Sequence, residues 1–228
     1  LMPIYTPGKL TLSRIQQYPA VIGEAWGGGY FAGYISHTAN ENPTHALIVA
    51  PRATGATGTG YPVTTNLRWK TTNTTTPGTT SLFDGAVNTA AMVTAGIALH
   101  PAGEFCVNLT LGGYTDWYMP ARYELDIAYF SLKSSTNQNS ILGTDGINIY
   151  SVPRRNSIYS LNYPLQTDVT IFKSGGTQAF GDLHWTSAEL SPAQGAGMSF
   201  STGDVFEDTG GKVNSGVCVR AFRKIALP

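Results

Sequence analysis

Residues 112–125 constrain the fold more than any other stretch, because a turn, aromatic residues and a helix start follow one another there. Gly112 and Gly113 can close a preceding helix in a left-handed cap. Pro120 fits the first position of the next helix, where its missing N–H leaves nothing unpaired. Glu124 falls in the first turn, where the helix dipole favours an anion. The apolar positions recur at helical spacing and predict a helix packed across a sheet; they are Leu125, Ala128, Tyr129 and Leu132.

Few charged side chains cover this chain. Charged residues make up 12% of the 228 residues, about half the roughly 25% of an ordinary soluble domain, and the formal net charge is zero. A chain of this length buries a sufficient core without disulfides. Because there is no basic field, we expect no nucleic-acid partner. We also expect no membrane insertion, since no run approaches the ~20 apolar residues of a membrane span.

The order of the predicted elements is that of an α+β protein. Two aromatic-rich runs on either side of 27–29 predict a β-hairpin, and a turn at 202–203 predicts another. The predicted strands are 21–26, 30–35, 46–50, 67–70, 183–188, 197–200, 205–207 and 217–224. The predicted helices are 84–95, 101–109, 120–132 and 168–173. The residues assigned to the structural core are Trp117, Pro120, Glu124, Leu125, Trp185 and Arg220.

We expect a single domain over residues 20–228, in which an N-terminal hairpin part, 20–66, packs on 67–228. Residues 1–19 are too short and too polar for a core. They are expected to form an arm that lies on a neighbouring subunit, or a loose terminus. The N-terminus lacks the basic start of a secretory signal, so either the chain is assembled into a particle from the cytosol or a leader is missing. The segment 134–163 has no sustained period and is expected to be a long functional or mobile loop.

No arrangement of residues predicts a metal, a cofactor or an active site. The histidines are dispersed and lie at no zinc spacing, and neither an EF-hand loop nor a G-x-S-x-G elbow occurs. Cys106 and Cys218 are the two cysteines, and the sequence leaves open whether they are buried thiols or a disulfide. We therefore expect binding rather than catalysis.

Three segments suggest a family. Residues 116–125, 185–189 and 219–223 resemble, in order and spacing, the "WRLP-x-x-x-EL … W-S-S … VRAVR" pattern of the domain that ends a bacterial collagen-like adhesin. That domain recurs in phage tail-fibre and other virion proteins, and the resemblance covers roughly residue 69 to the C-terminus. Tyr118 and Met119 depart from the pattern, which more often has Arg-Leu there.

The resemblance implies a fold similar to C-type lectins and to the formylglycine-generating enzyme, with a small twisted antiparallel sheet, flanking helices and long loops. The enzyme's chemistry needs two thiols close in sequence to hold copper, and here the two cysteines are far apart. The resemblance therefore implies a non-enzymatic phage virion protein, a tail-fibre or receptor-binding tip.

Two groups of residues are candidates for receptor contact. In the related folds the segment between the second tryptophan and the last strand carries these contacts. Its counterparts here are Gln194, Met198, Phe200, Asp204, Phe206 and Glu207. The long loop is the second candidate because aromatic rings with guanidinium groups are a common hot-spot composition. Its residues are Tyr150, Arg154, Arg155 and Tyr159.

The expected partners follow from the same resemblance. We expect a homotrimer in the virion that binds a host surface protein or glycan, with the arm contacting other virion proteins. One alternative is a structural or decorating component of the particle. The other is a secreted or cell-surface bacterial adhesin domain that binds sulfated glycans through Arg154, Arg155 and Lys173.

Overall fold

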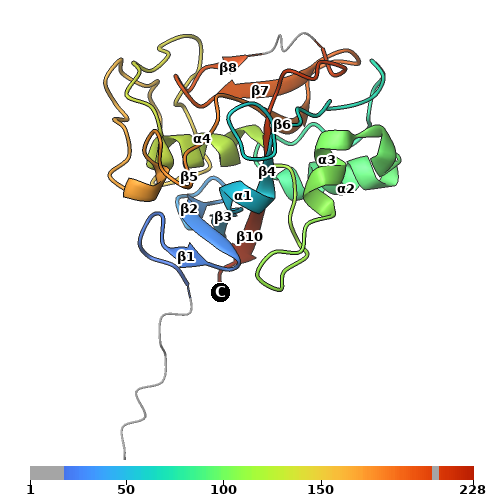
Figure 1. The fold of residues 1–228 in the computed structure, drawn as a ribbon. Helices are drawn as coiled ribbons and strands as arrows, with labels where there is room; N and C mark the ends of the chain where they lie inside the picture. The colour runs from blue at the N-terminus through green and yellow to red at the C-terminus, as the bar shows by residue number, and fades with distance from the viewer. Residues whose placement is uncertain (1–17, 207–210) are drawn as a thin grey trace, which may run out of the picture.

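The computed structural model describes residues 18–206 and 211–228 and confirms the α+β class (Figure 1). Its main antiparallel sheet has the order β1-β2-β3-β10, and β5 also pairs with β2. β3 lies between β2 and β10, so the prediction of a central strand at 46–50 is confirmed. The strands of this sheet are β1 (Ala25–Trp26), β2 (Gly29–Ile35), β3 (His45–Val49), β5 (Ser151–Val152) and β10 (Phe222–Ala226).

Two smaller antiparallel sheets complete the strands of the described residues. One consists of β6 (Leu183–Glu189), β7 (Gly195–Ser199) and β8 (Val205–Phe206), and the other pairs β4 (Ala56–Thr57) with β9 (Val219–Arg220). The predicted turn at 202–203 joins β7 to β8, and Gly203 supplies the positive φ of 75° that this turn requires.

The predicted helices α2 (Gly85–Thr94), α3 (Pro101–Val107) and α4 (Arg122–Leu132) are present. Asp84 caps α2 by accepting a hydrogen bond from the backbone N of Val87 at 3.1 Å. Short helical turns occur at α1 (Arg52–Gly55), η1 (Ile97–Leu99) and η2 (Thr170–Phe172). Of these three turns, η2 lies within the helix predicted at 168–173, so that helix is shorter than predicted.

Helix α4 begins at Arg122 and not at Pro120. Ala121 has an extended backbone, with φ −77° and ψ 168°, and its N–H donates to Oε2 of Glu124 at 2.8 Å. The Pro120 carbonyl accepts a hydrogen bond from Ser187 N at 2.8 Å, so it joins β6 instead of the helix. Pro120 thus directs the chain into the helix from outside its first turn.

Gly112 and Gly113 do not end a helix, because α3 has already ended at Val107. They form the turn of a small loop in which Leu111 and Tyr114 exchange two backbone hydrogen bonds, of 3.0 and 3.1 Å. Their φ angles of 61° and 83° suit a two-residue turn made of glycines.

The predicted strand at 67–70 is absent. Its backbone serves other partners: Leu67 O accepts from the Trp185 indole at 2.8 Å, and Arg68 O accepts from Ala102 N at 3.0 Å. The sequence also predicts an exposed loop over the Gly- and Thr-rich residues 52–66, but this segment begins with α1 and β4, because Ala56 and Thr57 pair with β9. Both differences depend on partners more than thirty residues away.

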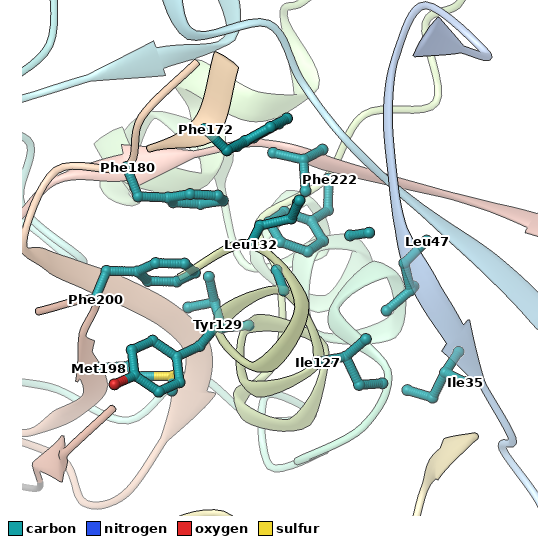
Figure 2. Packing of buried hydrophobic residues seen from close by; sticks show 14 of the residues in the cluster. Ile35, Leu47, Ile127, Tyr129, Leu132, Phe172, Phe180, Met198, Phe200 and Phe222 are labelled. Carbon is teal, nitrogen blue, oxygen red and sulfur yellow. The ribbon is translucent and has the colours of Figure 1, made fainter. Parts of the chain in front are cut away.

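Helix α4 lies between the main sheet and the β6-β7-β8 sheet (Figure 2). Ile127 points toward Ile35 and Leu47 on one side, while Tyr129 points toward Phe200 on the other. The apolar face predicted for this helix is buried. The six predicted core residues are buried as well, namely Trp117, Pro120, Glu124, Leu125, Trp185 and Arg220.

Cys106 and Cys218 are free and buried in different clusters. Cys106 packs in the cluster that contains Trp69 and Met92, and burial raises its pKa well above the ordinary value. Burial also raises the pKa of the Cys218 thiol to about 12. Of the two possibilities that the sequence left open, the structure has buried thiols.

His184 is a buried neutral histidine that makes stability depend on pH. Its Nδ1 lies 3.0 Å from Asp182 O, a carbonyl that only accepts, so Nε2 accepts from the Tyr61 hydroxyl at 2.5 Å. Burial lowers the pKa of His184 from 6.5 to about 4. Between those values the unfolded chain binds more protons than the folded chain, so stability falls as the pH falls from 6.5 to 4.

We predict that His184→Gln weakens this acid destabilisation relative to the native protein. The free energy of unfolding, measured by urea titration at pH 4, 5, 6 and 7, should converge for the two proteins toward pH 4. His37, whose pKa is also lowered by burial to about 4, remains in both proteins and cancels in the comparison. A constant difference across the pH range would contradict the assignment to His184.

Candidate functional site

Buried amide groups fix the long connection from α4 to β6. Asn139 Oδ1 accepts hydrogen bonds from Tyr129 OH at 2.6 Å and Lys133 Nζ at 2.7 Å. Its Nδ2 donates to Ser160 O at 2.9 Å and Pro164 O at 3.1 Å. Asn139 therefore ties both ends of the 139–164 loop to α4, so the loop has a defined shape without regular secondary structure.

A second buried network is centred on Asp126 of α4. Asp126 accepts from Asn148 Nδ2 at 2.6 Å, from the Tyr159 hydroxyl and from the Arg155 guanidinium, with which it forms an ion pair. Arg155 Nε also donates to Gly146 O at 3.2 Å. Desolvation lowers the pKa of Arg155 below its ordinary value, and the carboxylate partner holds the group in its charged form.

The guanidinium of Arg155 is stacked on Phe130, the outward-facing aromatic residue of α4. Its Cζ atom lies 4.3 Å from the Phe130 ring centroid. The Tyr163 ring approaches Phe130 edge-on, with 5.4 Å between the centroids. An aromatic and guanidinium cluster thus reaches the surface above a buried carboxylate.

Exposed apolar side chains surround this cluster. Six of the fourteen large hydrophobic residues that are exposed in the described part of the chain lie within 141–165, although that segment is little more than a tenth of it. Two of them, Tyr163 and Leu165, are 60% and 68% exposed. We call Phe130 together with four of the exposed apolar residues of this loop the loop face; the four are Ile158, Leu161, Tyr163 and Leu165.

The loop face contains two shallow cavities. One, of about 260 Å³, is lined by Phe130, Arg155, Ile158 and Tyr163. The other, of about 290 Å³, lies between Leu161, Leu165 and the 133–137 segment. This loop region lies beside α4 and β5, at the left of Figure 1. Its arrangement of apolar hollows around a fixed cation suits a partner with protruding groups.

A larger cavity, of about 450 Å³, lies on the other side of the Phe130 and Arg155 pair. It is bounded by β2, α4 and β5, and its walls are mainly apolar; they include Ile22, Ala32, Ile127, Val152, Pro153 and Val169. Phe130 and Arg155 line both this cavity and the 260 Å³ one, so they separate the two.

The residues predicted in the long loop have different roles. Arg154 is exposed, and its Nε donates to Asn156 Oδ1 at 2.7 Å. Tyr150 stacks on Phe83 with 4.4 Å between the ring centroids, so its ring is used within the fold. Tyr159 is 5% exposed, and its assignment as a receptor contact is wrong because its hydroxyl is committed to Asp126. Arg155 is largely buried and organises the loop.

The residues predicted at 189–212 do not form one exposed face. Met198 and Phe200 are 0% and 1% exposed, so their assignment to receptor contact is wrong: Met198 in β7 and Phe200 directly after it both point into the core beside α4 (Figure 2). The partly exposed members are Gln194, Asp204 and Phe206. Desolvation and the neighbouring Asp145 carboxylate raise the pKa of Asp204. Glu207 lies outside the described residues.

Sequence reasoning missed Phe130, Ile158 and Tyr163. Phe130 carries a usable signal, because it is a large apolar residue outside the buried face of a predicted helix. Ile158 and Tyr163 carry none, since their exposure depends on how Asn139 and Asp126 fold the loop.

Among residues 18–206 and 211–228 no group of three or more His, Cys, Asp and Glu side chains could hold a metal ion. None of the described helices has the length and apolar character needed to cross a membrane. No protein-family model, no curated protein and no solved structure matches this sequence.

Proposed function

We propose that this chain is a receptor-binding protein of a phage virion, which attaches to a host surface molecule through the loop face without catalysis. The main observation that supports this proposal is the loop face. The buried hydrogen bonds of Asn139 fix the backbone so that Leu161, Tyr163 and Leu165 are exposed together. Exposing several apolar side chains to water does not stabilise the isolated chain. Contiguous exposed apolar groups mark interaction sites, and aromatic rings beside a guanidinium provide their strongest contacts.

A C-type-lectin-like fold is part of this proposal. The small antiparallel sheet, the flanking helices and the long loops support it. Contacts between the three motif segments support it too: Tyr118 N donates to Phe222 O at 2.8 Å, and Ser187 N donates to Pro120 O at 2.8 Å. The three segments that carry the family resemblance thus form one unit around α4.

The proposed assembly is a homotrimer in the virion, with residues 1–19 contacting other virion proteins. A second candidate function, a structural component of the particle, draws on the same loop face. Permanent subunit interfaces are more apolar than transient ones, and the loop face would suit them. The partner that binds the loop face therefore distinguishes the two functions: a host receptor for attachment, and a neighbouring subunit for the structural function.

Binding to whole cells tests the attachment function. We expect the purified chain to bind at least one strain in a panel of bacterial strains saturably, with a molar mass in solution three times that of the chain. Both are measured on one preparation, by flow cytometry of the labelled protein and by light scattering. A monomer that binds no strain but associates tightly with other virion components would contradict receptor binding and support the structural function.

A further inference from the structure

A polar cavity of about 220 Å³ lies next to the loop face. The segments 133–137 and 173–175 contribute residues both to it and to the neighbouring 290 Å³ cavity. Phe180 and Phe200 line it, and their rings are stacked with 3.8 Å between the centroids and 11° between the planes. Both side chains are almost fully buried, at 8% and 1% exposed, so they close the cavity on its core side beneath a polar wall.

One side of the wall holds a cation with unused hydrogen-bonding capacity. Arg52 donates to Gly60 O through Nη2 and to Gly176 O, at 3.5 Å, through Nη1. Its Nε is one of two buried side-chain nitrogen or oxygen atoms in the described part of the chain that have no hydrogen-bond partner. A guanidinium carries two N–H donors on each Nη nitrogen, so Arg52 has donors left for a ligand in the cavity.

The wall also contains the opposite charge, the Asp182 carboxylate. Asp182 accepts through Oδ1 from Ser199 Oγ at 2.7 Å and Ser201 N at 3.2 Å. No described residue bonds to its Oδ2, and neither Arg52 nor Asp182 belongs to an ion pair of the described residues. Serine hydroxyls complete the wall, from Ser134, Ser135, Ser174 and Ser201.

This composition selects a class of ligand. The Asp182 carboxylate disfavours phosphate or sulfate, and the Arg52 guanidinium disfavours a cation. A neutral polyol satisfies both, because each hydroxyl can donate to a carboxylate and accept from a guanidinium. The volume is below the roughly 300 to 1,000 Å³ of pockets for drug-sized ligands, so it suits a single ring.

We propose that this cavity binds one neutral sugar ring, whose hydroxyls bond to Arg52, Asp182 and the serine side chains of the wall. The inference rests on the proposed attachment function and deepens it, because it names the chemical class of the receptor: a glycan with a neutral terminal sugar. The loop face beside the cavity then contacts the remainder of the same receptor.

Free sugars test the inference without cells. We expect saturation-transfer NMR to detect saturable binding of at least one of glucose, galactose, mannose and N-acetylglucosamine, with a dissociation constant on the order of 1 mM. Ser174→Trp fills the mouth of the cavity and keeps the backbone hydrogen bond to Ser134 O, and it should lower the affinity at least about tenfold. Thr177→Trp places the same side chain on the same loop outside the cavity and should bind like the native chain.

Three results would overturn the inference: no sugar of the panel binds, Ser174→Trp binds as well as Thr177→Trp, or inorganic phosphate binds and the sugars do not. The proposed attachment function fails separately. If the protein binds a sugar but binds no strain, the cavity remains a sugar site and the attachment function is refuted. Binding of Ser174→Trp to cells at native affinity leaves attachment intact and refutes the cavity as its receptor site.

Discussion

Arg220→Ala is expected to lower the free energy of unfolding by about 4 kcal/mol. The side chain is 1% exposed and donates to Ala50 O at 3.0 Å, to Gln178 O at 2.8 Å and to Gln178 Oε1 at 3.2 Å. Its Cζ lies 4.3 Å from the Phe180 ring centroid and 5.4 Å from that of Phe172. Burial lowers the pKa of Arg220 to about 10, so the group is charged at neutral pH, and these dipoles and rings, together with Tyr61, stabilise the charge.

Urea unfolding at pH 7 measures this loss. Arg220→Met retains packing against the two rings but leaves the carbonyl groups of Ala50 and Gln178 without their donors, so its stability should lie between native and Arg220→Ala. Arg68→Ala removes an exposed arginine and should stay within about 0.5 kcal/mol of the native protein. An Arg220→Ala protein within 1 kcal/mol of native, roughly a fivefold change in the folding equilibrium, would refute the structural role of the guanidinium.

Glu124→Ala is expected to cost about 3 kcal/mol, because one carboxylate joins the starts of two helices. Glu124 is fully buried and accepts from Tyr118 OH at 2.7 Å, from Ala121 N at 2.8 Å and from Gly85 N at 3.1 Å. Alanine leaves all three donors unpaired. Glu124→Gln keeps one oxygen for the two backbone N–H groups and should cost about 1 kcal/mol.

The same residue gives a pH dependence opposite to that of His184. Burial raises the pKa of Glu124 from 4.5 to about 7, although its hydrogen bonds act in the other direction. The folded chain then holds a proton that the unfolded chain has lost, so stability from this group is full below pH 4.5 and declines as the pH rises to 7. The difference in unfolding free energy between native and Glu124→Gln should therefore shrink over that range, and a constant difference would contradict the raised pKa.

The parts of the fold that local sequence determines were predictable. The apolar spacing of 125–132 identified α4 and its buried face, and Asp84 and Pro101 identified the starts of α2 and α3. The start of α4 was misplaced by two residues because the Pro120 carbonyl accepts a hydrogen bond from Ser187 N, a partner far along the chain that spacing cannot identify.

The candidate site was less predictable for the same reason. The sequence predicted a long functional or mobile loop at 134–163, but buried Asn139 and Asp126 determine which of its side chains are exposed. Alternation along β7 could not show that Met198 points into the core, because both faces of the β6-β7-β8 sheet are covered at that position. The polar cavity combines residues from five separate segments, and no single segment carries its signal.

The most direct test of the loop face compares two double variants in cell binding. Leu161→Ser with Leu165→Ser removes two exposed apolar side chains from the loop face, and Val87→Ser with Val93→Ser removes two of similar exposure from α2. We expect the first variant to lose at least about tenfold in apparent affinity for the strain that the native protein binds, and the second to match the native protein. Equal binding by both variants would contradict attachment through the loop face.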